Sequence, residues 1–157
     1  MNPLTENPGD GQDPGPGSPS RGLVLVVDDA PTVRMYHGGV LRAAGFTVEE
    51  AANGFEALEL LLVNRYDLVV TDVNMPHVDG LTLVRRLRGE ALGRSVPVVT
   101  ISTESQESDA EAGYAAGANL YLVKPVAPDL LTRVADLLTA PLPSPSSASS
   151  PTPGSRS

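Results

Sequence analysis

Acidic, hydroxyl and ammonium side chains stand at the ends of four apolar stretches in this chain. Asp28 and Asp29 follow the first stretch, and Asp72 follows the third. Ser102 closes the fourth stretch, and Lys124 follows the fifth. Three carboxylates, a hydroxyl donor and a compact positive charge are the groups that an aspartate needs to accept a phosphoryl group beside a metal ion. We therefore take these five residues as the candidate site, with Asp72 as the nucleophile.

The acidic residues also predict a metal site. Carboxylates that share one crevice repel one another, and a divalent cation between them removes that repulsion. Mg²⁺ prefers hard oxygen ligands, so Asp28, Asp29 and Asp72 would serve. The backbone carbonyl of Asn74, on the turn that leaves Asp72, is a further candidate ligand. The chain has no cysteine and no histidine stands among these residues, which argues against zinc. We expect Mg²⁺, with Mn²⁺ as an alternative.

Such residues meet only if strands bring them to one edge of a sheet. Stretches rich in Val, Ile and Leu predict strands over residues 23–27, 46–50, 66–71, 96–101 and 120–123. Segments of helical periodicity follow each strand, with starts near Pro31, Asn53, Asp79, Ser105 and Pro128. Strict alternation with short connections predicts an α/β fold, in which a doubly wound parallel sheet carries helices on both faces. The stretch 46–50 alternates in polarity and is predicted to be an edge strand. Ligands of such folds bind beyond the carboxyl ends of the strands.

Composition narrows the class of protein. The chain has 157 residues, a formal charge of −8 and no cysteine. Its acidity argues against direct binding of nucleic acid, and its lack of cysteine fits a reducing cytoplasm. We find no apolar run long enough to span a membrane and no signal peptide. Residues 1–21 and 141–157 are rich in Pro, Gly and Ser and predict disordered tails, which leaves 22–140 as the folded domain.

Each candidate residue also has a purely structural interpretation. The acids could cap a helix or form a turn, and the serine and the lysine could be ordinary loop and surface residues. Their coincidence at four strand ends favours a common site. His37 and His77 have no paired ligand nearby in the sequence, and we expect both at the surface.

The chain resembles the receiver domain of two-component response regulators, the CheY-like family, over residues 22–140. The resemblance rests on Val-Val-Asp-Asp at 26–29, Asp-Val-Asn-Met-Pro at 72–76, Asp-Gly at 79–80, Ile-Ser at 101–102, Gly-Ala at 117–118 and Tyr-Leu-Val-Lys-Pro at 121–125. It implies a flavodoxin-like sheet with strand order 2-1-3-4-5 and five helices. It also implies a phosphoacceptor that assists its own phosphorylation and dephosphorylation, rather than an enzyme with a separate substrate.

The resemblance gives each site residue a role. Asp72 would be phosphorylated by a sensor histidine kinase or a phosphotransfer protein, and Lys124 would contact the phosphoryl group. Ser102 would turn inward to bond that group, and Tyr121 would move from an exposed to a buried position in response. The peptide bond before Pro125 is expected to be cis.

Some positions around the site depart from the common pattern of the family. Thr103 replaces the usual Ala or Gly, which would narrow access to the phosphoryl group, and Ser102 replaces the more frequent Thr. Asn74 and Glu104, each two residues beyond a site residue, form a pair that resembles chemotaxis-type regulators. Their phosphoryl group is short-lived, so we predict rapid self-dephosphorylation.

The sequence in hand shows no output domain after the receiver-like part. Residues 113–120 are almost uncharged, which argues against the dimer of DNA-binding regulators. We expect a monomeric, single-domain switch that binds a downstream protein through its fourth helix, fifth strand and fifth helix.

Two alternatives remain open at this stage. One is a degenerate receiver that serves only as a docking module. The other is a Mg²⁺-dependent phosphohydrolase with an aspartate nucleophile, although such enzymes usually place that residue after the first strand. A flavodoxin-like cofactor binder is less consistent, because the two acids after the first strand would repel a phosphate.

Overall fold

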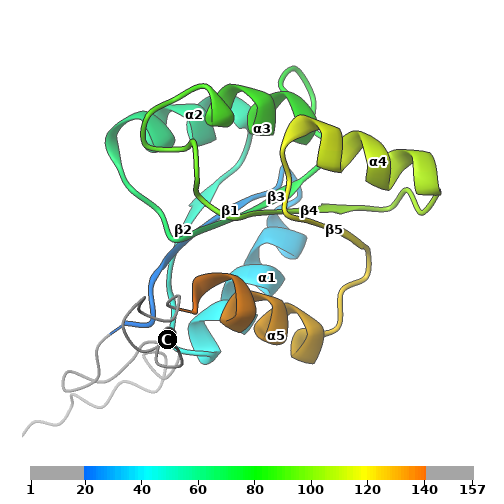
Figure 1. Cartoon of the computed structure of the whole chain (residues 1–157). Coiled ribbons are helices and arrows are strands. Elements are labelled where there is room, and N and C mark those ends of the chain that lie inside the picture. Colours follow the sequence, from blue (N-terminus) through cyan, green and yellow to red (C-terminus); the bar gives the residue numbers. More distant parts are fainter. Residues whose placement is uncertain (1–19, 141–157) are drawn as a thin grey trace, which may run out of the picture.

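A five-stranded parallel sheet forms the middle layer of the molecule in this computed structural model, which describes residues 20–140 (Figure 1). The strands are β1 (Leu23–Val27), β2 (Thr47–Ala51), β3 (Leu68–Asp72), β4 (Val98–Ser102) and β5 (Leu120–Val123). They lie in the order β2-β1-β3-β4-β5, which confirms the predicted order.

Five helices cover the sheet from both faces. They are α1 (Pro31–Ala43), α2 (Gly54–Val63), α3 (Gly80–Arg88), α4 (Glu107–Ala116) and α5 (Pro128–Thr139). Helices α1 and α5 lie on one face, and α2, α3 and α4 lie on the other (Figure 1). The predicted doubly wound α/β fold is confirmed. Across residues 20–140, none of the helices is long and apolar enough to cross a bilayer.

Alternating side chains of the strands build one hydrophobic core on each face of the sheet. In β1, Leu25 and Val27 pack in the core beneath α2 and α3, whereas Val24 and Val26 pack in the core beneath α1 and α5. All residues of β3 and β4 are buried. Within the described part of the chain β2 pairs with β1 alone, so the predicted edge strand is confirmed. The strands β3 and β4 are held by packing on both faces, and the candidate site lies at the carboxyl ends of such strands.

Local capping residues fix two helix starts as the sequence predicts. The side chain of Asn53 accepts a hydrogen bond from the backbone N–H of Glu56 at 2.9 Å, and the Glu56 carboxylate accepts one from the N–H of Ala52 at 2.7 Å. Asp79 caps α3 by accepting a bond from the N–H of Thr82 at 2.8 Å. The start of α3 is therefore set by side-chain chemistry close to the end of β3.

Several boundaries differ from the predicted ones. Strand β2 lies one residue later, at Thr47–Ala51 rather than 46–50, and β3 and β4 each end one residue later, at Asp72 and Ser102. Strand β4 begins at Val98 rather than at 96, because Pro97 has no N–H for the ladder. Strand β3 begins at Leu68 rather than at 66, and the side chain of Asp67 just before it accepts a bond from the N–H of Leu23 at 2.8 Å. Helix α4 begins at Glu107, two residues later than predicted.

The predicted tails, 1–21 and 141–157, lie outside the described residues except at Ser20 and Arg21. Arg21 packs against the domain. Its guanidinium forms an ion pair with Asp136, donates to the carbonyl of Ala44 at 3.0 Å and lies 4.9 Å from the centre of the Phe46 ring. The ordered contacts of the domain therefore include residue 21.

Candidate functional site

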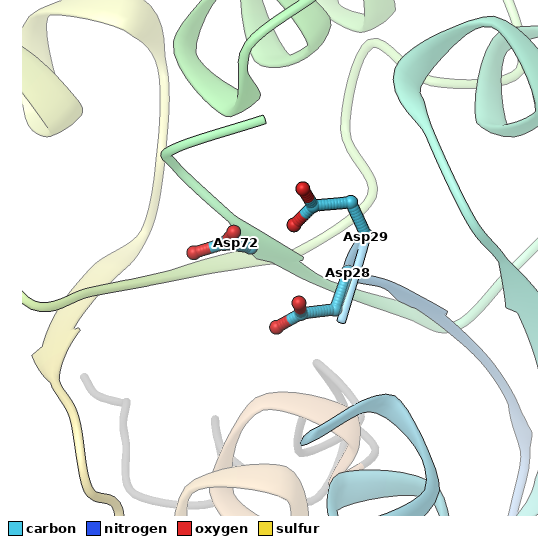
Figure 2. Close-up of side chains that lie close together, drawn as sticks. All are labelled: Asp28, Asp29 and Asp72. Carbon is cyan, nitrogen blue, oxygen red and sulfur yellow. The ribbon is translucent and has the colours of Figure 1, made fainter. Parts of the chain in front are cut away.

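The three acids predicted to share one crevice do so. Asp28 and Asp29 follow β1, and Asp72 ends β3, the neighbouring strand. One carboxylate oxygen of each lies within 4.8 Å of the other two (Figure 2). Asp28 and Asp72 are buried, whereas Asp29 is exposed. The cluster thus has two acids fixed in the protein and one that faces solvent.

Lys124 contacts two of these acids. Its Nζ lies 3.0 Å from Oδ1 of Asp72 and 3.3 Å from Oδ2 of Asp28. Its backbone N–H donates to the carbonyl of Ser102 at 2.8 Å, which anchors the residue just beyond β5. The peptide bond between Lys124 and Pro125 is cis. The ammonium group is therefore held directly beside the candidate nucleophile.

The electrostatics of the site leave a surplus of negative charge. Burial raises the pKa of Asp72 above its ordinary value of 3.8, and the charge of Asp28 adds to this, although the ion pair with Lys124 opposes it. Burial alone would lower the pKa of Lys124, but the ion pairs with Asp72 and Asp28 raise it overall. Lys124 therefore stays an ammonium at neutral pH, and it does not fully compensate the buried carboxylates.

Hydrogen bonds hold the loop that carries the first two acids. The Asp28 carboxylate accepts a bond from the N–H of Ala30 at 2.9 Å. The Arg34 guanidinium donates to the backbone carbonyl of Asp28 at 2.7 Å and to Glu50 on β2 at 3.1 Å. Arg34 thus ties the β1–α1 loop to the edge of the sheet. No motif in the sequence singles it out from the other arginines.

Gly80, the first residue of α3, lies against the backbone of Asp72. A Cβ atom on Gly80 would stand only 2.2 Å from the carbonyl oxygen of Asp72 and 2.8 Å from Cα of Val73. The N–H of Gly80 donates to the carbonyl of Val73 at 2.9 Å. This close approach, together with the Asp79 cap, fixes the backbone that presents the Asp72 carboxylate.

Ser102 lies at the centre of a second group of contacts beside the acids. It is fully buried at the end of β4. Its Oγ accepts bonds from the Asn74 side-chain amide at 3.2 Å and from the N–H of Glu104 at 3.0 Å. The hydroxyl of Tyr121 donates to the Glu104 carbonyl at 2.9 Å, and its ring is half-buried. The structure therefore brings these four residues together, while their roles in switching stay a prediction.

His37 was expected at the surface, and that prediction is wrong. Its side chain is only 3 % exposed, on the inner side of α1. Burial lowers its pKa, Asp28 opposes this with its negative charge, and Lys124 adds to the lowering. The histidine therefore lies near the charged groups of the site. The helical periodicity of the sequence did not predict this position. His77 is exposed as predicted.

The residues present fit a hard divalent cation. Oδ1 of Asp72 is buried and receives no well-directed hydrogen bond from the described residues, although Lys124 lies nearby. The exposed Asp29 leaves the cluster open to solvent on one side. Oxygen-only ligands of this kind suit Mg²⁺. The part of the Asn74 carbonyl in such a site stays a prediction.

Comparison with known sequences points to one family. The profile of the response regulator receiver domain matches residues 24–136. The gliding motility regulatory protein of Myxococcus xanthus is 41 % identical over 117 residues, which are 74 % of this chain and 15 % of that protein. The transcriptional regulatory protein PrrA of Mycobacterium tuberculosis is 46 % identical over 116 residues, 73 % of this chain and 49 % of that protein. The chain therefore spans half or less of these relatives.

Solved structures agree with this comparison. The chemotaxis protein CheY4 of Vibrio cholerae is 34 % identical to this chain, and the two structures superpose with a TM-score of 0.71. The superposition covers 74 % of this chain and 97 % of the CheY4 chain. The receiver domain of the sensor histidine kinase PA1611 of Pseudomonas aeruginosa is 29 % identical, with a TM-score of 0.72 over 76 % and 98 % of the two chains. That structure holds a magnesium ion in its active site cleft.

Proposed function

Because this chain belongs to the response regulator receiver domain family, we propose that it accepts a phosphoryl group on Asp72 from a phosphohistidine of a sensor histidine kinase or phosphotransfer protein. The observation that carries this proposal is the buried Asp72 carboxylate beside Asp28, Asp29 and the Lys124 ammonium. Receiver domains are phosphoacceptors rather than enzymes with a separate substrate, so the reaction changes the protein itself.

The proposed transfer uses groups whose positions are known. An oxygen of the Asp72 carboxylate attacks phosphorus, the bond from phosphorus to the imidazole nitrogen breaks, and that nitrogen keeps the electron pair while the other ring nitrogen carries a proton. The product is an acyl phosphate on Asp72 and a neutral histidine on the donor. A bound Mg²⁺ would neutralise charge on the phosphoryl oxygens, and Asp28, Asp29, Asp72 and the Asn74 carbonyl would hold it. Lys124 exchanges part of its contact with Asp72 for a phosphoryl oxygen, which keeps its charge compensated.

The new group changes the surface through Ser102 and Tyr121. We propose that the Ser102 hydroxyl donates to a phosphoryl oxygen and that Tyr121 becomes more buried as the β4–α4 loop adjusts. The face formed by α4, β5 and α5 then binds a downstream protein, with the chain acting as a monomeric switch. Tyr114, Val123 and Leu130 are large apolar side chains exposed on these elements, which suits a protein partner.

A short-lived phosphoryl group forms part of the proposal. The Asn74 and Glu104 pair and the likeness to a chemotaxis protein both favour a chemotaxis-type regulator in the cytoplasm. A phosphorylated half-life of many hours would contradict this part without affecting the assignment of Asp72.

Intact-mass measurement after incubation with Mg²⁺ and acetyl phosphate tests the main proposal. Wild type is expected to gain one labile phosphoryl group, and Asp72→Asn is expected to gain none. Omission of Mg²⁺ or addition of a chelator should remove the gain. A protein that takes no phosphoryl group from acetyl phosphate or from any kinase would instead be a docking module, and continuous turnover of a phosphate ester would indicate a hydrolase.

A further inference from the structure

The hydrogen bonds of Ser102 restrict what its hydroxyl can do. A serine hydroxyl has one proton to donate and two lone pairs to accept with. Both lone pairs of Ser102 Oγ are engaged, by the Asn74 amide at 3.2 Å and by the Glu104 N–H at 3.0 Å. The proton must then point along the one remaining direction, so this buried hydroxyl is available only as a donor.

Asn74 reaches Ser102 because the ends of β3 and β4 lie side by side. Asp72 stands opposite Ile101 in the sheet, and the N–H of Val73 donates to the carbonyl of Ile101 at 3.0 Å. Asn74, two residues past Asp72, therefore crosses from the end of one strand to the end of the next. Asn74 as a whole is an exposed residue, yet its side-chain amide donates to the oxygen of the fully buried Ser102.

We propose that the Asn74 side chain is a positioning residue, which fixes the Ser102 hydroxyl as a hydrogen-bond donor toward a phosphoryl group on Asp72. This inference rests on the proposed function. Of the two donors to Ser102, the Glu104 N–H belongs to the backbone, and any residue except proline would supply it. Only the donor at position 74 depends on the side chain. A carboxylate there would accept the serine proton instead of directing it.

Affinity for beryllofluoride, a non-covalent analogue of the phosphoryl group, tests the inference without a hydrolysis step. Binding in excess Mg²⁺ is measured by ¹⁹F NMR for wild type, Asn74→Ala, Ser102→Ala and the double variant. Loss of the Asn74 amide should weaken binding about fivefold in the wild-type background, the effect of one neutral hydrogen bond. In the Ser102→Ala background the same change should have little effect, because Asn74 acts through Ser102.

Asn64→Ala is the matched control, because the Asn64 amide also makes one hydrogen bond, to the Leu60 carbonyl at 3.1 Å, at the far end of α2. It should leave beryllofluoride affinity unchanged. An Asn74→Ala variant that binds like wild type, or that loses the same factor in the Ser102→Ala background, would overturn the inference and leave the proposed function intact. Failure of wild type to bind beryllofluoride at all would overturn both.

Discussion

Replacement of Gly80 by alanine should damage both the stability of the domain and the reactivity of Asp72. The added Cβ would lie 2.2 Å from the Asp72 carbonyl oxygen, at least 0.8 Å closer than real Cβ contacts allow. Both partners are backbone, so neither can rotate away. Forced overpacking of this kind costs about 2–3 kcal/mol of unfolding free energy, which corresponds to a melting temperature lower by roughly 10 °C in a domain of this size. A displacement of nearly 1 Å at the nucleophile should also slow phosphorylation by about 100-fold.

Gly39→Ala provides the control for the same change in another helix. A Cβ on Gly39 would meet no atom within 4 Å, so alanine there should raise the free energy of unfolding by about 0.5–1 kcal/mol. Stability is measured by chemical denaturation, and phosphorylation by the rate of mass increase with acetyl phosphate and Mg²⁺. If Gly80→Ala matched Gly39→Ala in both assays, the close approach between α3 and β3 would not position Asp72.

Three further predictions concern charge. Asp72→Asn should stabilise the metal-free protein at pH 7, because the raised pKa of Asp72 means that its ionised form destabilises the folded state. This gain in unfolding free energy should vanish as the pH falls to 3.8, the ordinary pKa of an aspartate. A constant gain in denaturation curves across this pH range would refute the explanation. Mg²⁺ at a hundredfold excess over its dissociation constant should raise the unfolding free energy by about 2.7 kcal/mol, and thermal scans should show that Asp28→Asn removes most of this gain. His37→Asn should make the melting temperature less sensitive to acidification from pH 7 to 5. The pKa of His37 is lowered in the folded protein, so acidification protonates the histidine of the unfolded state first and favours unfolding. An unchanged pH dependence of the melting temperature in the variant would contradict this explanation.

The strand ends were predictable because hydrophobic stretches mark interior strands and parallel strands end at one edge. Asp28, Asp72 and Lys124 each follow such a stretch, so their proximity needed no knowledge of side-chain geometry. The caps at Asn53 and Asp79 were predictable for a local reason, since each depends on a backbone N–H three residues away.

Contacts between loops were not predictable in the same way. The bond from Asn74 to Ser102 and the bond from Arg34 to the Asp28 carbonyl depend on side-chain rotamers and on the path of two turns. The burial of His37 follows from how α1 is rotated about its axis on the sheet, and the spacing of apolar residues in the sequence does not define that rotation to within one position. The close contact of Gly80 with the Asp72 backbone could be predicted only from the distance between the start of α3 and the end of β3, which the sequence does not contain.

The edge strand β2 carries two adjacent acids, Glu49 and Glu50, whose charges are held by neighbouring side chains. One side of β2 is unpaired among the described residues, and an open strand edge is a template for aggregation. Glu49 accepts a bond from the Tyr66 hydroxyl, and Glu50 binds Arg34 and Arg42. Their charges are held in place rather than left to rotate, so a strand from another molecule would meet fixed ionic groups at this edge. The arginine that steadies the Asp28 loop therefore also fixes a charged side chain of the edge strand.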